Sequence, residues 1–152
     1  MIMREPTDVF GEWAEIGKDR GMENSHAIAV NEMINFALKE RLEIGEKFSF
    51  LDLGCGNGWV ARLAANNALC SQAIGIDGAQ QMISNAQSRG GKTKYILADI
   101  NTFNSPEKYD VIHSMEVLYY LENPADIVKR ISDSWLNKNG RLIVGLDHYY
   151  EN

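Results

Sequence analysis

The 152-residue sequence contains few cysteines, few prolines and no long hydrophobic run. Its two cysteines, Cys55 and Cys70, are too few for a disulfide framework or a four-ligand zinc site, so we expect two free thiols and no metal site. No stretch of about 18 apolar residues is present to span a membrane. The first residues also lack the apolar segment of a secretion signal. The sequence therefore predicts a cytoplasmic protein without a membrane partner.

Basic residues are also scarce, since 15 Lys and Arg face 21 Asp and Glu and give a net charge of -6. Binding to a phosphate backbone requires a positive surface, so nucleic acid is not expected as a partner, whereas a small molecule is. Hydrophobic residues make up 45% of the chain and charged residues 24%, as in ordinary globular domains. The length fits one domain, so residues 1–152 are predicted to fold as a single unit.

Strands and helices are predicted to alternate through residues 46–152. Alternation of this kind indicates an α/β fold, with a doubly wound, mainly parallel sheet covered on both faces. Ligands bind such sheets outside the carboxyl ends of the strands. The predicted strands are 48–53, 72–77, 94–98, 109–113 and 141–146, and the predicted helices are 59–67, 79–88 and 124–136.

Residues 1–45 form a separate helical segment in this prediction. A weak helix is expected over 8–18, followed by a polar stretch over 19–24. Ser25 is a plausible N-cap for a firmer helix, which carries an apolar stripe at a 3.6-residue period. The residues of that stripe are Val30, Met33, Ile34, Ala37 and Leu38.

The first and second predicted strands end in residues that suit a nucleoside. A turn with glycines at 54, 56 and 58 follows the first strand and precedes a helix, which permits a tight turn and close approach of a ligand to the backbone. Asp77 ends the second strand, where a carboxylate can accept hydrogen bonds from a ribose diol. The alternative is that the glycines serve only the turn and that Asp77 caps the next helix.

The spacing of the glycines distinguishes between nucleosides. A dinucleotide fold has G-x-G-x-x-G, which would place its third glycine at Trp59 rather than at Gly58, so a nicotinamide oxidoreductase is disfavoured. The pattern D-x-G-x-G-x-G over 52–58 resembles motif I of the class I S-adenosylmethionine-dependent methyltransferases. The resemblance extends from about Phe48 to Asp147. It implies a Rossmann-like core with strand order 3-2-1-4-5, and S-adenosylmethionine as cofactor with S-adenosylhomocysteine as product.

The resemblance also gives each strand end a role. The turn at 54–56 would contact the methionine portion of the cofactor, and Asp77 would hold the ribose. Asp99 and Ile100 would bind the adenine, although Asp99 also suits an ordinary loop. Residues 114–121 would touch the cofactor and face the acceptor. The implied cofactor-binding residues are Asp52, Gly54, Cys55, Gly56, Asn57, Gly58, Asp77, Gly78, Met82, Asp99, Ile100, Ser114, Met115 and Glu116.

The N-terminal segment is similar to that of small-molecule-type members of the family. In those proteins the segment closes over the cofactor as a lid, which makes Trp13 and Met22 candidate walls of the site, with Tyr119 on the substrate side. The alternative is that Phe10 and Trp13 only pack a helix against the sheet. The residues that carry this similarity are Trp13-Ala14, Gly17, Met22-Glu23 and His26.

Methyl transfer from a sulfonium is an in-line displacement, which requires positioning more than a dedicated catalytic residue. Where the acceptor must lose a proton, His148, Glu116 and His113 are the candidate bases, although His113 also suits a core position. The fourth strand end reads Ser-Met-Glu-Val and lacks the family's Asn/Asp-Pro-Pro-Tyr/Phe grip on planar amino groups. A small organic acceptor is therefore favoured, methylated at oxygen, nitrogen or carbon.

An alternative is a non-catalytic S-adenosylmethionine-binding module, or a truncated methyltransferase, that acts with a partner. In the family, a further helix and an antiparallel strand pair follow the fifth strand, whereas this sequence ends at Asn152. We expect either a polypeptide that continues, which we favour, or an exposed fifth strand covered by a partner subunit, for example in a homodimer.

Overall fold

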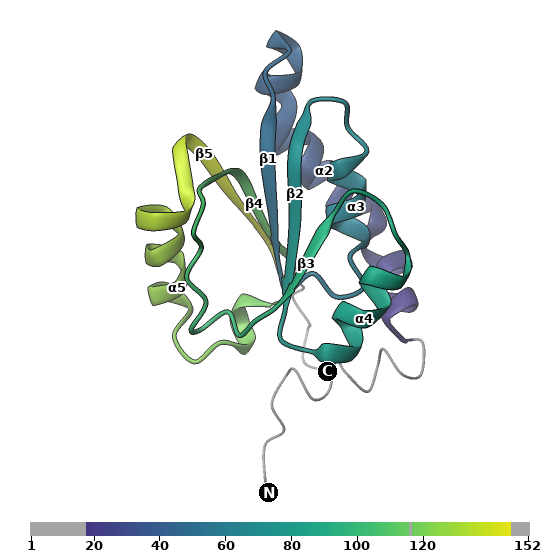
Figure 1. Cartoon of the computed structure of the whole chain (residues 1–152). Coiled ribbons are helices and arrows are strands. Elements are labelled where there is room, and N and C mark those ends of the chain that lie inside the picture. Colours follow the sequence, from purple (N-terminus) through teal and green to yellow (C-terminus); the bar gives the residue numbers. More distant parts are fainter. Residues whose placement is uncertain (1–17, 116, 147–152) are drawn as a thin grey trace, which may run out of the picture.

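The computed structural model describes residues 18–115 and 117–146, which form one sheet with helices on both sides (Figure 1). The strand order is β3-β2-β1-β4-β5, and all four pairings are parallel. This confirms the predicted fold class and strand order. The strands are β1 (Phe48–Leu53), β2 (Cys70–Asp77), β3 (Lys94–Leu97), β4 (Tyr109–Met115) and β5 (Leu136–Gly145).

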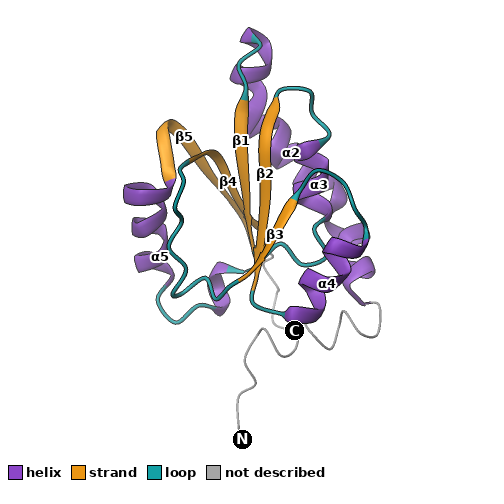
Figure 2. Ribbon diagram, viewed as in Figure 1, coloured by secondary structure: helices purple, strands orange, loops and turns teal. Residues whose placement is uncertain are grey.

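The helices divide between the two faces of the sheet. Figure 2 shows α2, α3 and α4 on one side and α5 on the other. After α5 the chain continues directly into one π-helical segment, η2, and a short 3-10 helix, η1, lies between β4 and α5. The bounds are α2 (Lys18–Ile44), α3 (Trp59–Ala65), α4 (Gln80–Ser88), η1 (Leu118–Tyr120), α5 (Pro124–Arg130) and η2 (Ile131–Trp135). No helix in the described part of the chain is long and apolar enough to cross a membrane.

Two hydrophobic cores lie on the two faces of the central strand β1. Side chains of a strand alternate between faces, so Phe48 and Phe50 point to one side while Leu51 and Leu53 point to the other. The two phenylalanines pack with α2 and α3. The two leucines pack in the cluster that includes α5 and η2. This burial on both faces explains why the strand reads as an almost continuous apolar run.

Helix α2 differs from its prediction at one end. The predicted N-cap, Ser25, lies inside the helix, because α2 includes residues 19–24. A single glycine such as Gly21 costs about 1 kcal/mol in a helix. That cost does not end a helix whose second half is anchored in the core by the buried Val30, Ile34, Ala37 and Leu38. The apolar stripe is thus confirmed, and it belongs to the layer that covers the sheet. The weak helix predicted over 8–18 lies almost wholly outside the described residues.

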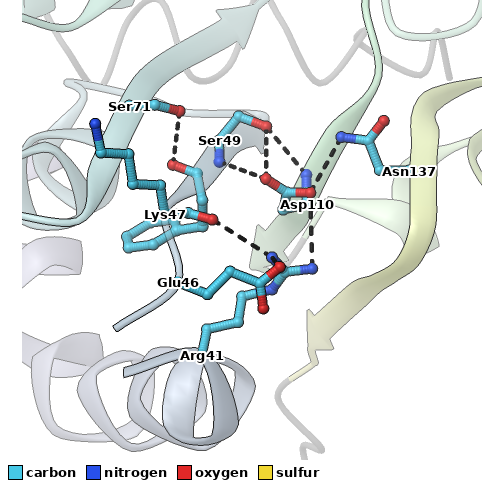
Figure 3. A network of polar contacts seen from close by, with 8 residues as sticks. Arg41, Glu46, Lys47, Ser49, Ser71, Asp110 and Asn137 are labelled. Atoms are coloured by element: carbon cyan, nitrogen blue, oxygen red, sulfur yellow. Dashed lines mark hydrogen bonds and ion pairs between the residues drawn. The ribbon is translucent and has the colours of Figure 1, made fainter. Parts of the chain in front are cut away.

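The starts of the strands are fastened by a polar network centred on Asp110 (Figure 3). Its carboxylate accepts hydrogen bonds from the Ser49 backbone N–H (2.9 Å) and from Asn137 Nδ2 (3.1 Å). Arg41, near the end of α2, approaches the same carboxylate at 3.6 Å. The network therefore joins α2, β1, β4 and the beginning of β5 at the end of the sheet opposite to the glycine turn.

Candidate functional site

The turn after β1 is bound to the end of β2 through its own backbone. The N–H groups of Gly54 and Cys55 both donate to the Ile76 carbonyl, at 2.8 and 2.9 Å. The Gly56 N–H donates to Asp77 Oδ2 at 2.9 Å. These amides are therefore used within the protein. A ligand at this turn would meet a fixed surface rather than a set of free N–H groups.

The three glycines of the turn have different reasons to be glycine. A Cβ at Gly58 would lie 2.5 Å from the ring of Tyr95 on β3, and a Cβ at Gly54 would overlap the side chain of Val117. At Gly56, by contrast, no atom of the described part of the chain lies within 4 Å of such a Cβ. All three have positive φ. The protein itself fills the spaces beside Gly54 and Gly58, and close approach of a ligand to the turn stays a prediction.

Asp77 links three elements at the end of β2. It is 7% exposed, and its Oδ1 accepts the Ala79 N–H at 2.8 Å while its Oδ2 accepts that of Gly56. The carboxylate thus holds both the glycine turn and the start of α4. Burial raises the pKa of the Asp77 carboxyl, and the backbone hydrogen bonds oppose that shift. The N-cap of α4 is Ala79, without a side-chain capping hydrogen bond, so the alternative that Asp77 caps this helix is wrong. Ribose binding by Asp77 stays a prediction.

The loop after β3 presents Asp99 at the surface. Its Oδ1 accepts the Asn101 N–H at 2.9 Å, and its carbonyl accepts the Phe103 N–H at 2.8 Å, which is an Asx-turn arrangement. Ile100, by contrast, is buried in the core on the α5 face. Asp99 is thus free to meet a ligand with its other oxygen, and contact of Ile100 with an adenine stays a prediction.

The end of β4 is fixed to β1 by buried polar groups. His113 Nδ1 lies 2.8 Å from Asp52 Oδ1, with both side chains buried, and the His113 ring stacks on Phe50 with centroids 6.3 Å apart. His113 Nε2 has no hydrogen-bond partner among the residues that the structure describes. The hydroxyl of Ser114 donates to the Leu53 carbonyl at 3.0 Å and is also buried. His113 is therefore a core histidine, and Asp52 holds it in place.

The remaining predicted residues fall into two groups. Cys55, Asn57 and Met82 are buried, Gly78 and Met115 are partly buried, and burial raises the pKa of the Cys55 thiol well above its ordinary value. Cys55 packs against Gly75, as expected for a small filler. The predicted residues Trp13, Glu116 and His148 lie outside the described residues, as do the side chains of Met22 and Tyr119. The described part of the chain has no group of three potential metal ligands.

Two residues that sequence reasoning missed, Arg62 and Tyr95, hold the glycine turn in place. Arg62 Nη1 donates to the Asn57 carbonyl at 2.6 Å and lies 3.3 Å from the Tyr95 hydroxyl. That hydroxyl lies 3.4 Å from the Gly58 carbonyl. The available signal was Gly75 in the middle of β2, since a glycine inside a strand often marks close approach of another group. Tyr95 is its register partner on β3.

The sequence of this chain is similar to those of known methyltransferases. Residues 51–144 match a family model described as a methyltransferase domain. The chain is 32% identical over 110 residues to (S)-coclaurine N-methyltransferase of Papaver somniferum, which covers 69% of this chain and 31% of that protein. It is 31% identical over 123 residues to malonyl-(acyl-carrier protein) O-methyltransferase of Halalkalibacterium halodurans, which covers 74% of this chain and 45% of that protein.

A solved structure of coclaurine N-methyltransferase, bound to N-methylheliamine and S-adenosylhomocysteine, is also similar. The TM-score is 0.62 at 26% identity, over 76% of this chain and 35% of that one. The chain thus spans less than half the length of these relatives. The family model covers the second half of β1, all of β2 to β4 and most of β5, including the glycine turn and Asp77. On this match and on its strand order, the chain belongs to the class I S-adenosylmethionine-dependent methyltransferase family.

Proposed function

We propose that this chain binds S-adenosylmethionine at the carboxyl ends of β1, β2 and β3 and transfers its methyl group to a small organic acceptor. The observation that carries the proposal is Gly56, whose N–H donates to the Asp77 carboxylate and whose Cβ position has none of the described residues within 4 Å. Open α/β sheets bind ligands at this position, outside the carboxyl ends of their strands. Family membership, and the S-adenosylhomocysteine held by the related coclaurine N-methyltransferase, support the identity of the donor.

Asp77 suits the ribose because its carboxylate has capacity left. Its oxygens accept the backbone N–H groups of Gly56 and Ala79, with a further backbone interaction from Gly78, and two carboxylate oxygens together offer about four acceptor positions. A ribose diol can therefore bind without releasing the turn. Asp99 suits the adenine amino group for a similar reason, since one of its oxygens accepts the Asn101 N–H and the residue is exposed.

The residues of this chain would act in methyl transfer by positioning the donor. When bound, S-adenosylmethionine supplies a methyl group to an acceptor lone pair in line, the carbon–sulfur electron pair stays on sulfur, and the acceptor loses its proton to a base or water. The turn at 54–58 is held by β2 and by Tyr95, so the donor meets a surface that needs no rearrangement. The buried carboxylates of Asp52 and Asp77 favour a cationic donor over an anionic one. Of the three candidate bases, Glu116 and His148 remain, because the His113 ring is buried.

Calorimetry with S-adenosylhomocysteine tests the cofactor. Asp77→Ala is a poor variant, because it would also free the amides of Gly56 and Ala79. Asp77→Asn is better, and Asp110→Asn is its matched control, since Asp110 holds backbone at the opposite end of the sheet. Micromolar binding is expected in the wild type and in Asp110→Asn. Asp77→Asn should bind at least about tenfold more weakly, because hydrogen bonds to a charged group contribute about 1.5–3 kcal/mol. Binding of NAD instead, or equal losses in both variants, would refute the proposal.

The acceptor requires a separate experiment. Because the chain spans less than half of its relatives, a cofactor-binding module that acts with a partner is the second candidate function. Incubation with methyl-labelled cofactor and a metabolite extract distinguishes the two, since only a transferase produces a labelled small molecule. A cytoplasmic location, and a dimer through β5, stay predictions. In the described part of the chain no strand pairs with the outer edge of β5, and light scattering after gel filtration measures the oligomeric state.

A further inference from the structure

Arg130, the last residue of α5, reaches across to the loop that carries Asp99. Its Nη1 donates to the Asn101 carbonyl at 2.7 Å. Its Nη2 donates to the Phe103 carbonyl and lies 3.4 Å from Asn104 Oδ1. One planar guanidinium therefore binds three residues of a single loop, a geometry for which arginine is suited and lysine is not.

The guanidinium is itself held by aromatic packing. Its carbon lies 5.4 Å from the centre of the Trp135 ring, within the range of a cation–π interaction. Phe103 meets the same ring edge-on at 5.5 Å. Trp135 is buried, and it is the last residue of the π-helical segment η2. The i to i+5 pattern of a π-helix brings residues five apart close to one another, which explains how Arg130 and Trp135 meet.

The Arg130 guanidinium contacts the same residues that hydrogen-bond to Asp99. The N–H of Asn101 donates to Asp99 Oδ1, and the N–H of Phe103 donates to the Asp99 carbonyl. Arg130 binds the carbonyls of both of these residues. Asn101 and Phe103 are therefore held from two sides, by Asp99 and by Arg130. A substitution at Arg130 therefore affects the Asp99 carboxylate through Asn101, which contacts both side chains.

We propose that Arg130 is a positioning residue, which orients Asp99 and thereby sets the preference of the site for adenine over a base that lacks the amino group. The inference rests on the proposed function, because it requires the nucleoside to lie against Asp99. Arg130 itself does not touch the ligand. Its effect is expected in the discrimination between two ligands rather than in binding as such.

The test compares S-adenosylhomocysteine with S-inosylhomocysteine, in which a carbonyl replaces the adenine amino group. The variants are Arg130→Met, which removes the guanidinium, and Arg130→Lys, which keeps the charge without the fork. Lys129→Met is the matched control, since Lys129 is the neighbouring cation and pairs with the exposed Asp133, at 3.1 Å, rather than with the Asp99 loop. Calorimetry measures both affinities, and thermal unfolding establishes that each variant is folded.

The wild type and Lys129→Met should prefer the adenine compound by about tenfold or more, as one hydrogen bond to a charged group provides. Both Arg130 variants should lose most of that preference, so the ratio of the two dissociation constants falls toward one. Should Arg130→Met fail to fold, Arg130→Lys decides the question. Equal weakening of both ligands, an unchanged ratio, or no preference in the wild type overturns the inference. Failure of the wild type to bind either compound refutes the proposed function instead.

Discussion

Replacing Gly58 with alanine tests whether this glycine is required by Tyr95 rather than by a ligand. The new Cβ would lie 2.5 Å from the ring and hydroxyl of Tyr95. That ring has little room to move, because it also lies close to Gly75, and Arg62 lies 3.3 Å from its hydroxyl. The chain must therefore accept both a crowded contact and a left-handed backbone, since Gly58 has φ 84.

The two costs can be separated. A non-glycine residue in the left-handed region costs about 1–2 kcal/mol, and overpacking of a fixed site costs about 1–3 kcal/mol more. Gly58→Ala should therefore lower the free energy of unfolding by about 2–5 kcal/mol in total. Gly90→Ala is the control, because Gly90 has φ 68 but nothing within 4 Å of its Cβ position. It should show only the backbone cost of about 1–2 kcal/mol.

Urea denaturation monitored by tryptophan fluorescence measures these free energies, provided that unfolding is two-state. In a double-mutant cycle, Tyr95→Leu should be less damaging in the Gly58→Ala background, with a coupling of about 1–3 kcal/mol. Equal losses in Gly58→Ala and Gly90→Ala, or an absence of coupling, would refute the claim that Tyr95 fills the space at Gly58.

Four further predictions concern the turn, the polar network and the two thiols. Gly56→Ala should cost only about 1–2 kcal/mol of stability, yet abolish binding of S-adenosylhomocysteine in calorimetry; retained binding would show that this space is not the ligand's. Asp110→Ala should lower the free energy of unfolding by about 2–4 kcal/mol, because it leaves part-buried donors unpaired, while affinity for the same ligand stays unchanged. Burial raises the pKa of the Cys55 thiol in the folded protein above its value in the unfolded chain. The thiol therefore contributes fully to stability below its unfolded-state pKa, and this contribution is lost as pH rises through its folded-state pKa. Cys55→Ala should flatten this alkaline decline in the free energy of unfolding, measured by urea titration. A thiol reagent should correspondingly label the half-buried Cys70 first, and equal labelling of both thiols in the native protein would contradict this.

Local patterns were enough to predict the sheet. The apolar run of β1 lies at Phe48–Leu53, as predicted. The fifth strand was predicted over 141–146, whereas β5 is Leu136–Gly145, because Leu136 already pairs with Tyr109 of β4 ahead of the apolar run. The start of α2 could not be predicted from Ser25, because residues 19–24 are helical only as an extension of a helix anchored further along. Helix η2 was also missed, since a π-helical segment depends on how Trp135 packs against Phe103, a contact between distant parts of the sequence.

A sequence motif predicts where the candidate site lies, but it does not predict what each motif residue contacts. The motif residues Gly54, Gly58 and Asp77 lie at the strand ends where a ligand is expected, but the structure engages each of them first with the protein itself. A sequence records that a position must be glycine or aspartate and does not record which neighbour requires it. That neighbour, such as Tyr95 for Gly58, is supplied by strand pairing across the sheet. A variant at a motif position therefore tests ligand binding only when its protein contacts are matched by a control, as Asp110→Asn does for Asp77→Asn.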